Sequence, residues 1–328
     1  MAFYITQIYG GGSRDDQLQA RVAQAAASIG ISTIGIRQCQ QERLATELLA
    51  ALRPLSAGDG LIVQLPLASD QVVGETLLAV LDSLDKDQAS IPLVLFLHRL
   101  LFSRPGLLEQ SRALLKRSNA VIVPDSPAGR RVAQLDVTDR PVITCQLLDA
   151  VSNLSFSQLP TFSRHLNVCD PPTPAALNSW AVAAVPEHVY NAGFAVDNPA
   201  CIDRGQAEND ALILALHQEG GFGLLLDDDA LQMNLGSFVA ASLPLVVAKS
   251  NPQSAWVYRY GLGHVVESPA GAARCIRQTP AAIYEAMARR VEQFGRLSRR
   301  GYFLRRALLE GEYRALLDGQ GLAKGAEQ

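Results

Sequence analysis

The chain has 328 residues, which is long for one hydrophobic core, because domains usually hold about 100–200 residues. Hydrophobic residues make up 48% of it and charged residues 19%, as in ordinary globular proteins, so two domains are expected. The formal net charge is −3, from 29 basic and 32 acidic residues, which argues against nucleic acid or an anionic membrane surface as a partner.

The first half alternates strands with amphipathic helices. A helix with Leu18, Val22 and Ile29 at helical spacing follows the first strand, with Ser13 as its candidate cap. The strands are apolar on both faces, which predicts a parallel sheet covered on both sides. The predicted strands are Phe3–Ile8, Ser32–Ile36, Gly60–Leu65, Leu93–Leu97, Ala120–Val123 and Pro141–Cys145, and the later helices are Glu42–Leu52, Val72–Leu84, Leu107–Lys116 and one from Ser126.

A serine-rich stretch without a period, Asp149–Ser163, interrupts this alternation and is interpreted as a linker. A second alternating set follows it, and Thr279 is expected to cap a long helix with Pro280 in its first turn. Its predicted strands are His165–Val168, His188–Tyr190, Gly221–Leu226, Pro244–Ala248 and His264–Glu267, and its helices are Asn209–Gln218, Leu231–Ala241, Thr279 to about Phe294, and Tyr302–Leu317.

These patterns predict an α/β protein with two Rossmann-like domains that face a cleft. The domains are residues 1–150 and 164–300, joined by a linker at 151–163. The last helix, in 301–328, is expected to cross back to the N-terminal domain or to meet an oligomer partner, because its apolar face needs a cover. Doubly wound sheets bind ligands at the carboxyl ends of their strands, so the cleft is the expected site.

The cysteines and the N-terminus bear on metal sites and on the compartment. The five cysteines are scattered without CxxC or Cys/His ligand spacing, so no metal is expected and the thiols are interpreted as buried and reduced. The sequence has no signal-peptide pattern at Met1 and no run of 18 apolar residues. A cytoplasmic protein without a membrane span is the expectation.

Three local motifs have both a functional and a structural interpretation. Gly10, Gly11, Gly12 and Ser13 form either a backbone cradle on the acceptor side or a strand-to-helix turn. His98, at the end of a strand, is a candidate catalytic group that orients a sugar hydroxyl or acts as a base; a structural histidine is the alternative. Asp227–Asp229 follow a buried strand, where a solvated loop is favoured over a metal motif.

The most informative stretch is a strand-loop-helix unit in the second half, Glu219–Asp229 followed by Leu235–Val247. A helix that starts beside small residues can hold a diphosphate on its backbone N–H groups. Together with Tyr260–Gly263 and the basic run Arg299–Arg306, this stretch resembles the third glucosyltransferase family of serine-rich-repeat adhesin O-glycosylation, which is related to the galactofuranosyltransferases. The candidate donor-binding residues are Gly220, Gly221, Phe222, Gly223, Asn234, Leu235, Gly236 and Ser237.

The resemblance covers essentially the whole chain, since Gly58-Asp59 and Phe96-Leu97-His98 agree in the first half. It implies a glycosyltransferase B fold, no metal cofactor, and transfer of glucose from a UDP-sugar donor to GlcNAc on an adhesin-like protein or glycan acceptor. It also implies a homo-oligomer or a complex of glycosyltransferases.

The sequence departs from the family at two cationic positions. The family has a lysine where this chain has Asn234, and an arginine where it has Pro174 or a neighbour; in the family both cations face the diphosphate. Because such cations stabilise the departing UDP, their loss is costly unless Arg204, Lys249 or the Arg299–Arg306 run replaces them. That basic run contacts phosphate, an acidic partner or only water.

Two hypotheses therefore stand side by side. The first is a retaining glycosyltransferase that transfers a hexose from a UDP-sugar. The second is a catalytically degenerate subunit that keeps the fold as a binding or partner protein. Asn234 and Pro174 favour the second hypothesis, and the intact blocks Gly221–Gly223 and Leu235–Phe238 favour the first.

Overall fold

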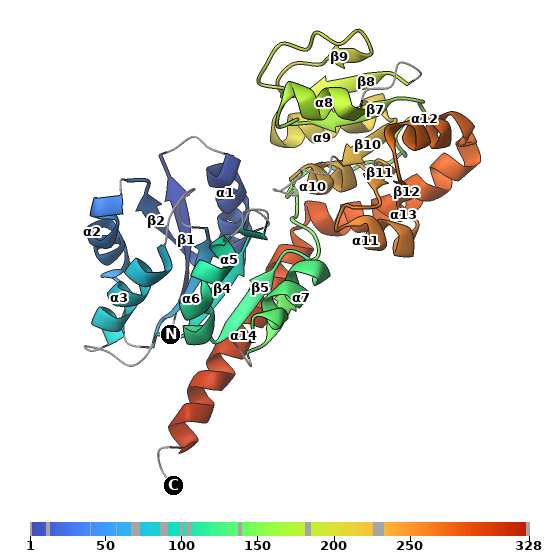
Figure 1. Cartoon of the computed structure of the whole chain (residues 1–328). Coiled ribbons are helices and arrows are strands. Elements are labelled where there is room, and N and C mark those ends of the chain that lie inside the picture. Colours follow the sequence, from blue (N-terminus) through green and yellow to red (C-terminus); the bar gives the residue numbers. More distant parts are fainter. Residues whose placement is uncertain are drawn as a thin grey trace. The chain divides into compact units, whose positions relative to one another are not determined.

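The computed structural model describes residues 2–10, 14–39, 41–56, 58–66, 73–85, 91–98, 101–102, 106–136, 140–180, 185–225 and 233–325. The chain divides into two compact units (Figure 1). Unit 1 comprises Met1–Gln146 together with Phe303–Gln328, and unit 2 comprises Leu147–Tyr302.

Unit 1 contains a parallel sheet with the strand order β2-β1-β3-β4-β5-β6. Each predicted strand of the first half is confirmed, whereas the predicted helix Leu107–Lys116 is interrupted at Ser111, whose hydroxyl donates to the Leu107 carbonyl. The strands are β1 Phe3–Tyr9, β2 Ser32–Arg37, β3 Gly60–Leu65, β4 Leu93–Leu97, β5 Ala120–Val123 and β6 Val142–Thr144; the helices are α1 Arg14–Ala27, α2 Gln41–Leu52, α3 Val73–Asp85, α5 Leu107–Gln110, α6 Arg112–Arg117, α7 Ser126–Gln134 and α14 Tyr302–Gly325.

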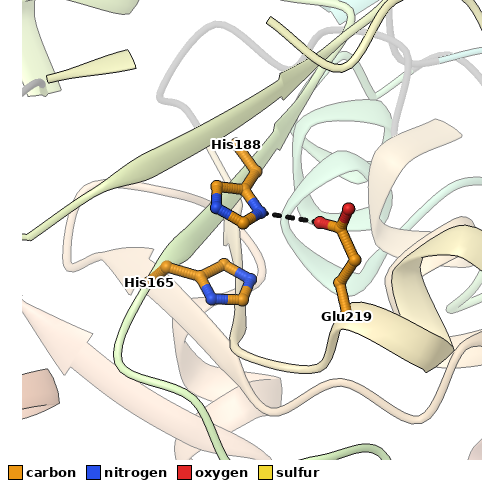
Figure 2. Close-up of side chains that lie close together, drawn as sticks. All are labelled: His165, His188 and Glu219. Carbon is orange, nitrogen blue, oxygen red and sulfur yellow. Dashed lines mark hydrogen bonds and ion pairs between the residues drawn. The ribbon is translucent and has the colours of Figure 1, made fainter. Parts of the chain in front are cut away.

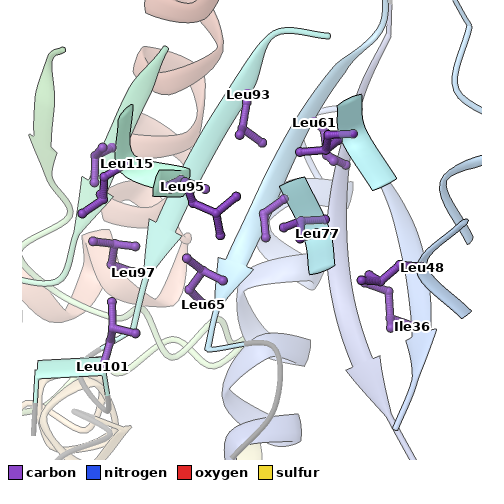
Figure 3. Packing of buried hydrophobic residues seen from close by; sticks show 14 of the residues in the cluster. Ile36, Leu48, Leu61, Leu65, Leu77, Leu93, Leu95, Leu97, Leu101 and Leu115 are labelled. Atoms are coloured by element: carbon purple, nitrogen blue, oxygen red, sulfur yellow. The ribbon is translucent and has the colours of Figure 1, made fainter. Parts of the chain in front are cut away.

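Alternate residues of these strands cover opposite faces of the sheet, and both faces are apolar. On one face, leucines of the central strands pack against α2, α3 and α6 (Figure 3). On the other face lies α14, where a Cβ on Gly311 would come within 3.1 Å of Val94 and Ile122. The Arg306 guanidinium also donates to the Thr144 carbonyl at 2.7 Å. The terminal helix thus belongs to unit 1, although it follows unit 2 in the chain.

Unit 2 contains a second parallel sheet, with the order β12-β11-β10-β7-β8-β9. Its predicted strands and helices are present, and the structure adds β9, α8, α11 and α12, which the sequence analysis missed. The strands are β7 Leu166–Cys169, β8 Glu187–Tyr190, β9 Cys201–Asp203, β10 Phe222–Leu225, β11 Leu245–Ala248 and β12 Gly263–Val266; the helices are α8 Pro174–Trp180, α9 Asn209–Glu219, α10 Met233–Ala240, α11 Ser254–Tyr260, α12 Pro269–Gln278 and α13 Ala281–Arg299.

One helix cap was predicted wrongly. Thr279 does not cap the long helix α13; Pro280 is its N-cap residue, and Thr279 ends the preceding helix α12. The Thr279 hydroxyl donates to the Cys275 carbonyl, one turn back, and lies 2.9 Å from His264 Nε2. Thr279 therefore caps the C-terminus of α12 rather than the N-terminus of α13, because its hydroxyl binds a carbonyl of the preceding turn.

The predicted linker segment has no helix or strand, but it is packed against unit 2. The Phe156 ring stacks on His217 with ring centres 3.6 Å apart, and the Ser152 N–H donates to the Arg299 carbonyl. A Cβ on Gly236 would lie 2.2 Å from the Leu148 carbonyl oxygen, so this segment passes very close to α10. Among the described residues no helix is both long and apolar enough to cross a bilayer.

Candidate functional site

The strand order of unit 2 defines where a ligand is expected. The chain builds β7, β8 and β9 toward one edge of the sheet, then crosses back to add β10, β11 and β12 toward the other edge. The order reverses between β7 and β10. In open parallel sheets, ligands bind outside the carboxyl ends of the strands at such a reversal. The candidate site of unit 2 therefore lies where β7 and β10 end.

Asn234 connects the two sides of this reversal. It lies in the first turn of α10, which follows β10, and its amide Nδ2 donates to the carbonyl of Cys169, the last residue of β7, at 2.8 Å. The next helix after β7 is α8, whose first turn is closed by the Thr173 hydroxyl accepting from the Ala176 N–H. Pro174 is the first residue of that helix. Both positions at which the sequence departs from the resembled family thus flank the end of β7.

The other predicted donor residues of the α10 block are buried. Leu235, Gly236 and Ser237 are buried, whereas Asn234 is partly exposed. Gly236 is required by the close approach of the Leu148 carbonyl rather than by a ligand. Of this block, Asn234 is therefore the residue whose side chain is placed to meet a ligand.

Two glycines of the predicted donor block lie away from the edge of the sheet where ligands are expected. Gly220 and Gly221 precede β10 and lie at its amino end, opposite to the edge where ligands bind. Both have a positive φ, and a Cβ on Gly220 would lie 1.8 Å from the Thr161 carbonyl oxygen. Within β10, Phe222 is fully buried, and a Cβ on Gly223 would lie 2.4 Å from the Phe238 ring. Close packing accounts for these four residues, and we do not propose that they contact a donor.

Three sets of cations were expected as replacements for the missing ones. Lys249 directly follows β11 at the carboxyl edge, is exposed, and pairs with Glu267 at 2.9 Å. Arg204 is paired with Glu219. Arg299 is 5% exposed and is bound to Glu292 at 3.0 and 3.2 Å and to the Ala240 carbonyl. Arg204 also directly follows a strand, β9, but β9 is the far edge strand of the sheet, whereas β11 lies next to β10. Of Lys249, Arg204 and Arg299, Lys249 is thus the one that follows a strand beside the reversal.

Unit 1 has its own reversal, between β1 and β3, and Gly10 directly follows β1 there. Gly10 is exposed, has φ near 101°, and has open space where a Cβ would be. Gly11, Gly12 and Ser13 lie outside the described residues, as do Asp227, Asp228 and Asp229. The acceptor-side role of Gly10–Ser13 stays a prediction.

Beneath the unit 1 reversal lies a network of uncharged polar side chains. Gln64 of β3 donates to the carbonyls of Thr6 and Gln19, and its Oε1 lies 2.8 Å from His98 Nε2. Gln19 in turn accepts from the Ile8 N–H and donates to the Pro66 carbonyl. Each of these amide groups has a partner, so the network holds β1, β3 and β4 in one arrangement.

The environment of His98 favours its structural interpretation. The residue is 4% exposed, and burial lowers the pKa of its imidazole to about 3. A general base needs a pKa near the working pH and must reach its substrate. His98 is instead neutral at pH 7, covered, and bound to Gln64.

A second polar cluster lies on the face of the unit 2 sheet that α9 covers. His165 precedes β7, His188 lies in β8, and Glu219 is the last residue of α9 (Figure 2). The two imidazole rings stack with centres 4.0 Å apart, and His188 Nδ1 lies 2.6 Å from Glu219 Oε2. Burial acts to raise the pKa of Glu219, but His188 and the paired Arg204 outweigh burial and lower it. Glu219 is therefore ionised at neutral pH.

Three buried polar atoms in this region have no partner at hydrogen-bond geometry. They are His165 Nε2, Asn167 Oδ1 and the Tyr190 hydroxyl. Asn167 nevertheless faces His165, and Glu219 faces Tyr190, closely enough to affect the pKa values of His165 and Tyr190. Asn167 is the register partner of His188 on the neighbouring strand, and Tyr190 follows two residues after His188 on the same face. This cluster was not predicted from the sequence, because its members are far apart in the chain and none of them stands in a ligand-spacing motif.

Two family models match the chain. Residues 2–147 match the glucosyltransferase 3-like N-terminal domain, and residues 168–311 match the glucosyltransferase 3-like C-terminal domain. The chain belongs to the glucosyltransferase 3-like family. Glucosyltransferase 3 of Streptococcus parasanguinis is 24% identical, over 97% of this chain and 100% of that protein. The resemblance stated from sequence motifs is confirmed.

Solved structures of glycosyltransferases have the same fold as this chain. An α-glucosyltransferase in complex with UDP and a 13-mer DNA superposes with a TM-score of 0.58 at 14% identity, over 96% of this chain and 99% of that one. A Medicago truncatula protein complexed with UDP-glucose gives 0.53 at 10% identity, over 96% and 98%. The predicted fold class, two Rossmann-like domains of the glycosyltransferase B type, is confirmed.

Proposed function

We propose that this glucosyltransferase 3-like chain transfers a hexose from a UDP-sugar to a glycan or glycosylated-protein acceptor. The observation that supports this most is the placement of Asn234. It lies at the strand-order reversal of unit 2, where open α/β sheets bind ligands, and bridges α10 to the end of β7. The structural neighbours with UDP or UDP-glucose bound support a uridine nucleotide as the donor.

We assign Lys249 the electrostatic role of the two missing family cations. The diphosphate of a departing UDP gains negative charge, and one charge-assisted contact is worth about 1.5–3 kcal/mol. Lys249 directly follows β11, and its present partner Glu267 is exposed, so the ion pair opens at low cost. A Lys249 contact with the diphosphate explains how the site works without a lysine at position 234.

Calorimetric titration of UDP and of UDP-glucose into the full chain tests this function. Wild type is expected to bind UDP, Lys249→Ala to bind about tenfold or more weakly, and Asn234→Lys to bind more tightly. Lys116→Ala, which removes an exposed lysine from α6 of unit 1, is the matched control and leaves binding unchanged. Release of UDP in the presence of a GlcNAc-bearing peptide then measures transfer.

The same titration separates the proposal from its alternative. If neither wild type nor Asn234→Lys binds UDP, the donor site is closed and the chain is a degenerate partner subunit. If wild type binds UDP but Lys249→Ala binds equally well, another cation contacts the diphosphate.

We also propose that the chain acts in the cytoplasm as a homo-oligomer. A nucleotide-sugar donor fits that compartment. For the oligomer, α14 exposes the apolar side chains of Tyr302, Leu309, Tyr313 and Leu317 at helical spacing, a surface typical of subunit contacts. Light scattering on Leu309→Glu is expected to show a smaller particle than wild type; an unchanged mass would exclude this helix as the interface.

A further inference from the structure

We propose that His165, His188 and Glu219 bind a divalent transition-metal ion, with zinc as the best match. Their ligand atoms, one ring nitrogen from each histidine and one carboxylate oxygen, all lie within 4.8 Å of one another. Two imidazoles and one carboxylate form the ligand set of many zinc sites that keep a fourth position open. In Figure 2 each imidazole turns a nitrogen toward the side on which Glu219 lies.

His165 is prepared for ligation. Its side chain is 5% exposed, its Nδ1 lies 2.7 Å from the Ser163 hydroxyl, and its Nε2 has no partner. When the Nδ1–H donates to Ser163, the lone pair of Nε2 is free, and this is how a second hydrogen bond orients a metal-binding histidine.

The geometry needs only side-chain adjustment to accept an ion. Two ligand atoms bound to one tetrahedral zinc lie about 3.3–3.5 Å apart, because each zinc–ligand bond is about 2.0–2.1 Å long. The distance between His188 Nδ1 and Glu219 Oε2, now 2.6 Å, would increase. The longer distances among the three ligand atoms, which reach at most 4.8 Å, would decrease. Glu219 can make this adjustment because it ends α9 and its side chain is partly exposed.

A fourth ligand is available in the same row of side chains. The Asn167 amide donates to the Gly220 carbonyl at 2.8 Å, which leaves Oδ1 as an unpaired acceptor. The Tyr190 hydroxyl faces the Glu219 carboxylate, so it lies beside a proposed ligand. Asn167 Oδ1 is therefore the candidate fourth ligand, with the Tyr190 hydroxyl beside it.

Arg204 limits the affinity of this site. Its guanidinium pairs with Glu219 Oε1, and a positive charge beside a dication opposes binding. The inference does not depend on the proposed transferase activity, since these groups lie under α9 rather than at the carboxyl edge of the sheet. The ion would connect the end of α9 to β7 and β8.

The test measures zinc directly in the untagged full chain. After growth with added zinc, mass spectrometry is expected to find one zinc per chain; after chelator treatment, titration with zinc chloride against a competing dye should restore it. His165→Asn and Glu219→Gln should weaken zinc binding roughly tenfold or more. His264→Asn is the control, because His264 is a partly buried histidine of the same unit that pairs with Thr279.

Arg204→Gln keeps all three ligands and is expected to bind zinc more tightly. This variant tests the site even if a variant that lacks a ligand fails to fold. X-ray absorption at the zinc edge of the wild type should show nitrogen and oxygen ligands. The inference is overturned if the wild type has no saturable zinc binding at equimolar zinc, if His165→Asn binds as well as wild type, or if sulfur ligands are found.

Discussion

The two units have similar parallel sheets, yet they differ in the polar side chains that they bury. Beneath its reversal, unit 1 buries uncharged amides and one neutral histidine, and the amides of Gln19 and Gln64 are paired. Its buried carboxylates, Asp59 and Asp125, accept from backbone N–H groups. Unit 2 buries or half-buries ionised groups: the pair Arg299–Glu292 and the cluster of His188, Glu219 and Arg204. A paired neutral network holds one geometry, whereas a charged cluster with unpaired neighbours can respond to a ligand. Binding chemistry is therefore expected in unit 2.

The largest expected effect comes from the buried ion pair of unit 2. Arg299→Ala leaves the Glu292 carboxylate buried without its main partner, which typically costs about 3–5 kcal/mol in the free energy of unfolding. Arg296→Ala is the matched control, because Arg296 contacts the same Glu292 at 3.0 Å but is 71% exposed, and should cost less than about 1 kcal/mol. Urea unfolding measures both. If both variants lost the same free energy of unfolding, burial would not decide the strength of the Arg299–Glu292 and Arg296–Glu292 pairs.

A buried titratable group of unit 2, the Glu187 carboxyl, should make the free energy of unfolding depend on pH. Burial raises the pKa of Glu187 to about 7, and one of its oxygens has no partner. The folded chain thus holds a proton that the unfolded chain has released above its ordinary pKa, so stability falls as pH rises from about 4.5 to 7. The wild type should lose on the order of 2–3 kcal/mol from this group across that range.

Glu187→Gln removes this dependence, and thermal unfolding from pH 5 to 8 should show a difference between the two proteins that grows with pH. His165 and His98, whose pKa values are lowered, act in the opposite direction and are common to both proteins, so the difference isolates Glu187. A constant difference across the range would contradict the raised pKa.

The neutral network of unit 1 should give a smaller, pH-independent effect. Gln64→Leu leaves His98 Nε2 and the Thr6 carbonyl without their partner, at a cost of about 1–3 kcal/mol. Urea unfolding at low and high salt should give the same loss, because no charge is involved. A salt-dependent loss would mean that unit 1 also depends on buried charge.

The smallest effect is expected where only the backbone is constrained. Gly10→Ala places a side chain at positive φ in open space, which costs about 1 kcal/mol. Gly220→Ala in unit 2 also has positive φ, but its Cβ would collide with the Thr161 carbonyl, so the loss should be larger. Thermal unfolding compares the two variants; similar losses would contradict the close packing at Gly220.

The sequence predicted the strands well and their side-chain roles less well. Leu93–Leu97 and Ala120–Val123 were assigned correctly, because unbroken apolar runs between helices are typical of a parallel sheet. The short elements α8 and β9 were missed, since Pro174–Trp180 and Cys201–Asp203 are too short to show a sustained period. At the candidate site, Asn234 was located from a motif, but the packing role of Gly220 and Gly221 required knowledge of what passes beside them.

Sequence alone determined the two-sheet architecture and the family, because hydrophobic period and motif blocks are properties of neighbouring residues. The tertiary structure decided which partners each charged side chain has. Arg299 and Arg306 stand in one basic run, yet Arg299 is bound inside unit 2 and Arg306 donates to a carbonyl of unit 1. His165, His188 and Glu219 meet only because β7, β8 and the end of α9 are adjacent in the folded sheet. Residue type and spacing along a chain do not record such distances, so only the folded structure reveals them.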